Sequence, residues 1–107
     1  MKAIKIKITK FVDDHQPGFV ECKFNDAFGK EHIVIEKVPI VINEYLNENS
    51  SYPQDGVIAC IILKTWQDDK QRKIVTVTIS EPIYNTSEER LTEFDLLEDQ
   101  LTEYLLL

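Results

Sequence analysis

The chain is poor in the residues that build disulfide scaffolds, phosphate-binding loops and membrane spans. Its 107 residues include two cysteines, two histidines and three glycines. The glycines are isolated from one another, so neither glycine-rich phosphate motif, GxGxxG or GxxxxGK[ST], occurs. The longest apolar run, Val57 to Leu63, is far shorter than the ~20 residues that a transmembrane helix needs. These shortages argue against a disulfide-rich protein, a nucleotide-binding loop and a membrane-spanning helix.

The cysteine pattern and the N-terminus point to a reducing compartment. Isoleucine alternates with lysine from Ile4 to Ile8, whereas a signal peptide carries a continuous apolar stretch. We therefore expect a cytoplasmic protein, in which cysteines stay reduced. Cys22 and Cys60 lie 38 positions apart, which fits neither a CxxC pair nor half of a zinc site. Both are in phase with apolar strand residues, which predicts two buried and unreactive thiols.

Charge is distributed unevenly along the chain. Residues 1–80 carry 11 basic and 11 acidic side chains, whereas residues 81–107 carry eight acids against Arg90 alone. The whole net charge of −7 therefore lies in this acidic C-terminal segment. The N-terminus is the reverse, since four lysines precede the first acid, Asp13. The sequence predicts a basic first strand and an acidic last segment within one domain.

Alternation of apolar and polar residues predicts most of the secondary structure. Isoleucine recurs at every second position from Ile4 to Ile8, the pattern of a half-buried strand, and the phase breaks after Lys10, which predicts a bend or bulge. Similar alternation predicts strands over residues 20–25 and 73–79, and apolar, β-branched stretches bounded by turns predict two more over residues 31–37 and 57–66.

Two segments of the middle region carry further expectations. The spacing of Ile42, Tyr45 and Leu46 predicts a short helix over residues 41–48. The strand over 57–66 is apolar on both faces as far as Leu63, which is typical of a central strand that is covered on both sides.

The last quarter of the chain allows two interpretations. Large apolar residues recur every three or four positions: Leu91, Phe94, Leu97, Leu101 and Leu105. With a capping box near Ser87, this spacing predicts an amphipathic helix. Alternation over residues 92–97 predicts instead a strand, whose outward Glu93 and Asp95 would lie opposite the lysines of the first strand. We favour this sixth strand, followed by a short helical end.

The order of these elements suggests an architecture. Three strands, a short helix and two more strands form the order of a five-stranded OB barrel, and an SH3-like barrel with a helical plug would give the same signals. We predict an all-β, five- or six-stranded barrel, OB-like or SH3-like, with one short helix between strands three and four. The single domain spans residues 1–107.

Turn and core residues carry a resemblance to other proteins. They are Phe11 to Asp14, Gln16 to Gly18, Val20 to Cys22, Asp26, Ala27, Gly29, His32, Ile35 to Val41, Tyr52, Pro53, Gly56 and Thr92 to Phe94. In these residues the chain resembles a family of short bacterial proteins whose function is not established. The resemblance implies a bacterial source and assigns no catalytic residue.

Catalytic and metal-binding constellations are weak. Cys22 and His32 are the nearest approach to a nucleophile and base, but an inward-facing cysteine has a raised pKa and is inert. Asp13, Asp14 and His15 offer suitable metal ligands, yet we expect adjacent side chains to point in different directions. We therefore expect a protein that is not an enzyme and that has no metal or other cofactor.

The charge pattern favours a protein partner. We expect Glu88, Glu89, Glu98 and Asp99 to bind a basic protein, as an inhibitor or immunity-type protein does, with Trp66 as an exposed anchor. A barrel that binds a small molecule or single-stranded nucleic acid is the alternative. The net charge of −7 makes nucleic acid the less favourable ligand, because it repels phosphate.

Overall fold

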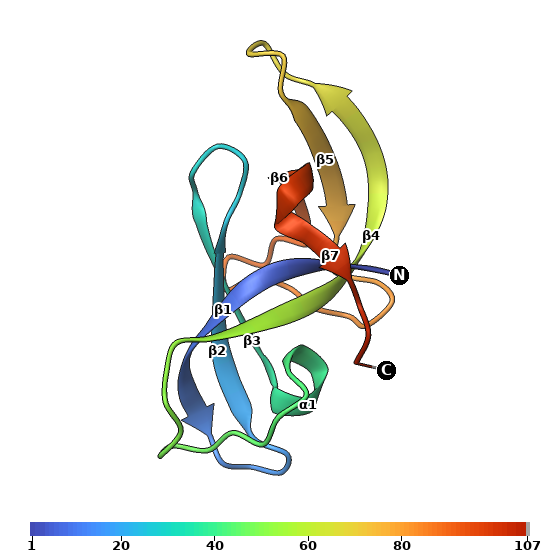
Figure 1. The fold of residues 1–107 in the computed structure, drawn as a ribbon. Helices are drawn as coiled ribbons and strands as arrows, with labels where there is room; N and C mark the ends of the chain where they lie inside the picture. The colour runs from blue at the N-terminus through green and yellow to red at the C-terminus, as the bar shows by residue number, and fades with distance from the viewer. Residues whose placement is uncertain (107) are drawn as a thin grey trace.

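The computed structural model describes residues 1–106, and its regular secondary structure is almost entirely antiparallel strand (Figure 1). The elements are β1 (Lys2–Asp13), β2 (Phe19–Asn25), β3 (Glu31–Lys37), α1 (Val38–Val41), β4 (Gln54–Gln67), β5 (Lys73–Thr78), β6 (Glu93–Leu97), the 3-10 turn η1 (Glu98–Gln100) and β7 (Leu101–Glu103). This arrangement confirms the predicted small, barrel-like β domain with one short helix between the third and fourth strands. Seven strands are present instead of five or six.

The first strand is the centre of the sheet. The strand order is β3-β2-β1-β4-β5-β6, and β7 also pairs with β1. The first half of β1 lies between β4 and β7, and its second half pairs with β2. The register with β2 shifts between Ile8 and Lys10, which confirms the predicted irregularity at Lys10. The bend allows one strand to serve both parts of a sheet that curls into a half-barrel (Figure 1).

The hollow side of the curled sheet is filled by apolar side chains. Ile4 and Ile8 of β1 are fully buried and pack with residues from β2 to β6. Two backbone hydrogen bonds draw the β2–β3 hairpin toward the end of the chain. The Ala27 amide donates to the Asp95 carbonyl (2.8 Å), and the Glu88 amide donates to the Ile33 carbonyl (2.8 Å). The C-terminal segment thus covers the open side of the core.

The helix is shorter and earlier than the sequence predicts. The expected helix over 41–48 is wrong, because α1 ends at Val41 and Ile42 is already extended. Pro39 lies in the first turn, where its fixed φ favours a helix start and its missing N–H costs nothing. Beyond Ile42, local side-chain bonds around Asn47 compete with a helix. No helix among residues 1–106 is long and apolar enough to cross a membrane.

The last quarter of the chain forms the predicted strand, but with a different neighbour. β6 pairs with β5, so Glu93 lies opposite Thr78 and Asp95 lies opposite Thr76. The expected pairing of these two acids with the lysines of β1 is therefore wrong. The short strand β7 takes that position, with Glu103 opposite Lys2. A three-residue strand is too short to give an alternation that a sequence reader would recognise.

The expectation that β4 is covered on both sides holds for its first half alone. Its pairing with β1 ends where Lys2 meets Cys60, and the rest of β4 pairs with β5 on one edge. From Ile61 to Gln67 every side chain is exposed. The β4–β5 hairpin accordingly projects from the body of the molecule (Figure 1).

Substitution of Gly56 tests the contact between α1 and β4. A Cβ atom there would lie 2.7 Å from the Val41 carbonyl oxygen and 2.9 Å from the Ile6 side chain. Because backbone atoms cannot yield as a side-chain tip does, we expect Gly56→Ala to lower the free energy of unfolding by about 1–3 kcal/mol in urea denaturation. Gly29→Asn is the matched control, since nothing lies within 4 Å of that site and asparagine tolerates its positive φ. Equal unfolding midpoints for the two variants would contradict the close approach.

Candidate functional site

Two loops meet at the end of the molecule opposite the β4–β5 hairpin (Figure 1). One loop joins β1 to β2, and the other follows α1. Between them is a depression of about 380 Å³. It is lined by Phe11, Asp14, Gln16, Pro17, Gly18, Tyr45, Leu46, Asn47, Glu48 and Asn49.

A second depression of about 440 Å³ adjoins the first. Gln16, Pro17 and Tyr45 line both, so these residues form the wall between them. The second depression is otherwise lined by Val38, Pro39, Ile42, Asn43, Glu44 and Leu106. We call the two depressions together the loop-end groove.

The β1–β2 loop is held in place by its own hydrogen bonds. The amide of Gly18 donates to the His15 carbonyl (2.6 Å), and the Gly18 carbonyl accepts from the Val38 amide (3.0 Å). Gly18 has a positive φ of 94°, and an added Cβ would lie 3.0 Å from the Phe11 ring. The loop is thus tied to α1 at one point and packed on a core aromatic residue at another.

The second loop is anchored by one buried side chain and by hydrogen bonds around Asn47. Leu46 is buried, and the Tyr52 hydroxyl donates to the Asn47 carbonyl (2.7 Å). The amide of Asn47 donates to the Ser50 hydroxyl (3.0 Å). Tyr45, which directly precedes these anchored residues, is 83% exposed. A large side chain held this far into solvent by an ordered loop is available to a partner.

The charged residues of the loop-end groove are acidic. Asp14 and Glu48 line the first depression and Glu44 lines the second, and neither lining includes lysine or arginine. Within residues 1–106, none of these three carboxylates forms an ion pair. Sequence reasoning missed Tyr45, Glu44 and Glu48 because their helical spacing with Ile42 and Leu46 suggested a packed helix.

Asp13, Asp14 and His15 lie nearer to one another than we expected. One ligand atom of each falls within 4.8 Å of the others, so the argument that their side chains diverge is wrong. All three are exposed, and Asp13 already bonds the His15 ring (2.5 Å). This bond raises the pKa of His15 and, with the backbone bond from His15, lowers the pKa of Asp13. The arrangement is explained as an internal acid–base pair in a turn.

The acidic residues predicted to bind a partner have mixed positions. Glu89 pairs with Lys30 (3.1 Å), and Glu98 pairs with Lys73, whose hydrogen bond lowers the pKa of Glu98. Asp99 accepts a bond from Lys5 through its backbone carbonyl (2.9 Å) and leaves its carboxylate exposed. Glu88 is exposed and forms no ion pair among the described residues. Half of this predicted set is therefore neutralised by the protein's own lysines.

Trp66, the predicted anchor, lies near the tip of the β4–β5 hairpin. Its side chain is 37% exposed, and its indole N–H donates to the Thr76 hydroxyl (2.9 Å). The Thr76 hydroxyl in turn donates to the Asp95 carboxylate (2.5 Å). The polar atom of the indole is thus satisfied internally, and the ring is placed far from the loop-end groove.

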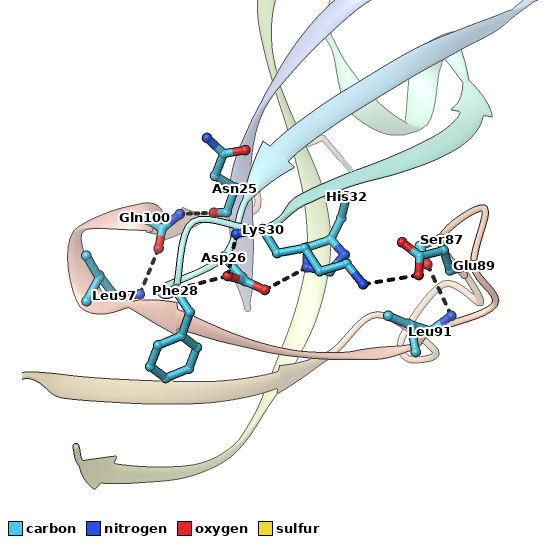
Figure 2. A network of polar contacts seen from close by, with 10 residues as sticks. All are labelled: Asn25, Asp26, Phe28, Lys30, His32, Ser87, Glu89, Leu91, Leu97 and Gln100. Carbon is cyan, nitrogen blue, oxygen red and sulfur yellow. Dashed lines mark hydrogen bonds and ion pairs between the residues drawn. The ribbon is translucent and has the colours of Figure 1, made fainter. Parts of the chain in front are cut away.

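A partly buried acid–base pair, Asp26 and His32, fixes the β2–β3 hairpin (Figure 2). One oxygen of Asp26 accepts the amides of Phe28 (2.9 Å) and Lys30 (3.1 Å), and the other accepts the Nε2 proton of His32 (2.8 Å). Burial disfavours ionisation of Asp26, but these bonds outweigh it and lower its pKa. The His32 ring lies edge-on to the Phe94 ring, with the ring centroids 4.6 Å apart, and its Nδ1 atom has no hydrogen-bond partner. The pair is a structural support between hairpin and core.

Both cysteines are fully buried, as predicted, and they are not bonded to each other. Cys22 lies opposite Val34, whereas His32 lies opposite Phe24, so no cysteine–histidine pair forms across the hairpin. Burial raises the pKa of Cys22 to about 12 and that of Cys60 to about 11. A thiol in this state is protonated at neutral pH and is a poor nucleophile.

Comparison with family models, with curated proteins and with solved structures returns no match. The resemblance to short bacterial proteins therefore stays an expectation.

Replacement of Asp26 tests the hairpin support. We expect Asp26→Asn to lower the free energy of unfolding at neutral pH by about 1–3 kcal/mol, because the amide cannot accept both backbone N–H groups and the imidazole proton. Because folding lowers the pKa of Asp26, its contribution to stability is fully present when the pH is above the unfolded pKa of about 4. The contribution is lost as the pH falls through the folded pKa. Urea denaturation against pH measures it, with exposed Asp69→Asn as control. A deficit that does not shrink in acid would contradict the assignment.

Thiol labelling tests the burial of the cysteines. In native buffer we expect neither Cys22 nor Cys60 to react with a water-soluble aromatic disulfide, because the thiols are inaccessible and their pKa values are raised. In urea both should react at the rate of a free thiol. Rapid labelling of either cysteine before unfolding would show that the surrounding strands open more easily than their packing implies.

Proposed function

We propose that this protein is a non-catalytic interaction domain that receives a cationic segment of a protein partner in the loop-end groove. The observation that carries the proposal is the set of carboxylates of Asp14, Glu44 and Glu48, which line the groove and form no ion pair within residues 1–106. Negative carboxylates around a partly apolar depression favour a ligand that has both a cationic and an apolar group.

The other acidic residues are better suited to attract a basic partner than to contact it in the final complex. Glu89 and Glu98 already face lysines, while Glu88 and Asp99 keep exposed carboxylates at the C-terminal end. Together with the net charge of −7 they add to a negative field. Such a field raises the rate of encounter with a basic partner more than it tightens the final complex. In this proposal the predicted acidic set steers the partner, and the groove holds it.

Both loops are held in place before a ligand binds, and this favours binding. Both are anchored by backbone hydrogen bonds, so a ligand would meet a groove that is already formed and would not have to order it. Tyr45 supplies the large, rigid, exposed ring that is common among residues important for binding. Trp66, at the other end of the molecule, would be a separate contact on which the proposal does not depend.

Removal of the groove charges tests the proposal. The variant Asp14→Asn/Glu44→Gln/Glu48→Gln and the control Glu89→Gln/Glu98→Gln/Asp99→Asn each lose three negative charges. We expect the groove variant to bind a fluorescent glycine-spaced peptide of alternating arginine and lysine about tenfold more weakly in fluorescence anisotropy. The control should lose about threefold or less, and its loss should vanish at physiological ionic strength. Equal losses for the two variants would show a diffuse charge effect and overturn the proposal.

A further inference from the structure

The two depressions of the loop-end groove differ in chemistry. The first contains two carboxylates, Asp14 and Glu48, together with the aromatic residues Phe11 and Tyr45. The second contains one carboxylate, Glu44, and is otherwise largely apolar, with Val38, Pro39, Ile42 and Leu106. One cation and one apolar side chain would therefore be sorted between the two depressions by charge and by apolar contact.

The two depressions share a wall. Pro17 and Tyr45 line both depressions, so two ligand groups on either side of this wall lie close together. In an extended chain, alternate side chains point to the same side about 6.6 Å apart. A single extended segment can thus fill both depressions with two side chains that are two positions apart. This binding mode needs no helix or folded domain.

The first depression suits arginine better than lysine. A planar guanidinium can form paired hydrogen bonds with carboxylates and can also stack on the ring of a tyrosine. Lysine offers a point charge with stronger hydration and gains less from a ring. Tyr45 is 83% exposed, so one face of its ring is open to such stacking.

We infer that the loop-end groove recognises an extended peptide segment that places an arginine in the first depression and a large apolar side chain in the second. The inference rests on the proposed function, which requires a cationic partner but does not distinguish arginine from lysine. It adds a preference within that class and names Tyr45 as the residue that creates the preference.

The test uses short capped peptides of glycine and serine that carry one arginine and one leucine, two positions apart, in both orders. Matched peptides replace arginine by lysine, or leucine by serine. With the unmodified protein, we expect the better arginine–leucine order to bind about fivefold more tightly than its lysine counterpart and its serine counterpart, by isothermal titration or chemical-shift titration.

Variants of the protein assign the preference to its residue. Tyr45→Ala should remove the preference for arginine and leave lysine peptides within about twofold of their original affinity, while Tyr45→Phe should retain it. Tyr84→Ala is the control, because Tyr84 is also exposed, at 71%, but lines neither depression. Both replaced side chains are mostly in solvent, so circular dichroism should show an unchanged fold.

The possible outcomes separate the two proposals. If neither arginine nor lysine peptides bind, or if removal of the three groove charges leaves binding unchanged, the proposed function fails and the inference fails with it. If both peptides bind equally and depend equally on the groove charges, the proposed function stands and the arginine preference is overturned. A preference that survives in Tyr45→Ala also overturns the assignment to Tyr45.

Discussion

The whole domain depends on the pairing capacity of one strand. β1 is hydrogen-bonded to β2, β4 and β7, and its isoleucines, which include Ile4 and Ile8, lie at the centre of the core. Three strands can share it because it bends near Lys10, so each half offers an edge in a different direction. The sheet therefore curls around these side chains, and the segments that β1 does not reach are left as projections or loops.

The charge pattern follows from the same strand. Lysines alternate with the buried isoleucines on its outer face, and acids from distant parts of the chain answer them: Lys2 faces Glu103 and Lys7 faces Asp55. Exposed pairs of this kind contribute little individually to stability. Their main effect is on the surface charge, because many of the lysine side chains are neutralised by the protein's own carboxylates. Within the described part of the chain, the carboxylates of Asp14, Glu44 and Glu48 at the loop-end groove are left without an internal cation.

Local patterns were sufficient to predict the strands but not their neighbours. The alternation from Ile4 to Ile8 depends on period and burial, which the sequence carries directly. The partner of β6 depends on how the chain returns from residue 79 to 92, and no local pattern reports that path. The exposure of Tyr45 could not be predicted for a related reason. Its helical spacing with Ile42 suggested that both residues lie on one buried face, but the helix ends before that face forms. The groove exists between two loops, so neither loop alone predicts it.

The exposed edge of β4 and the loop-end groove, both within residues 1–106, differ in their capacity to select a partner. The edge of β4 from Ile61 to Gln67 offers backbone groups and apolar side chains, which any extended chain can satisfy. The loop-end groove combines shape, carboxylates of one sign and an exposed Tyr45 on loops that are held by hydrogen bonds. Specificity is a difference between affinities, so it needs features that some ligands satisfy and others do not. The groove has such features, and for that reason we place recognition there and not on the hairpin.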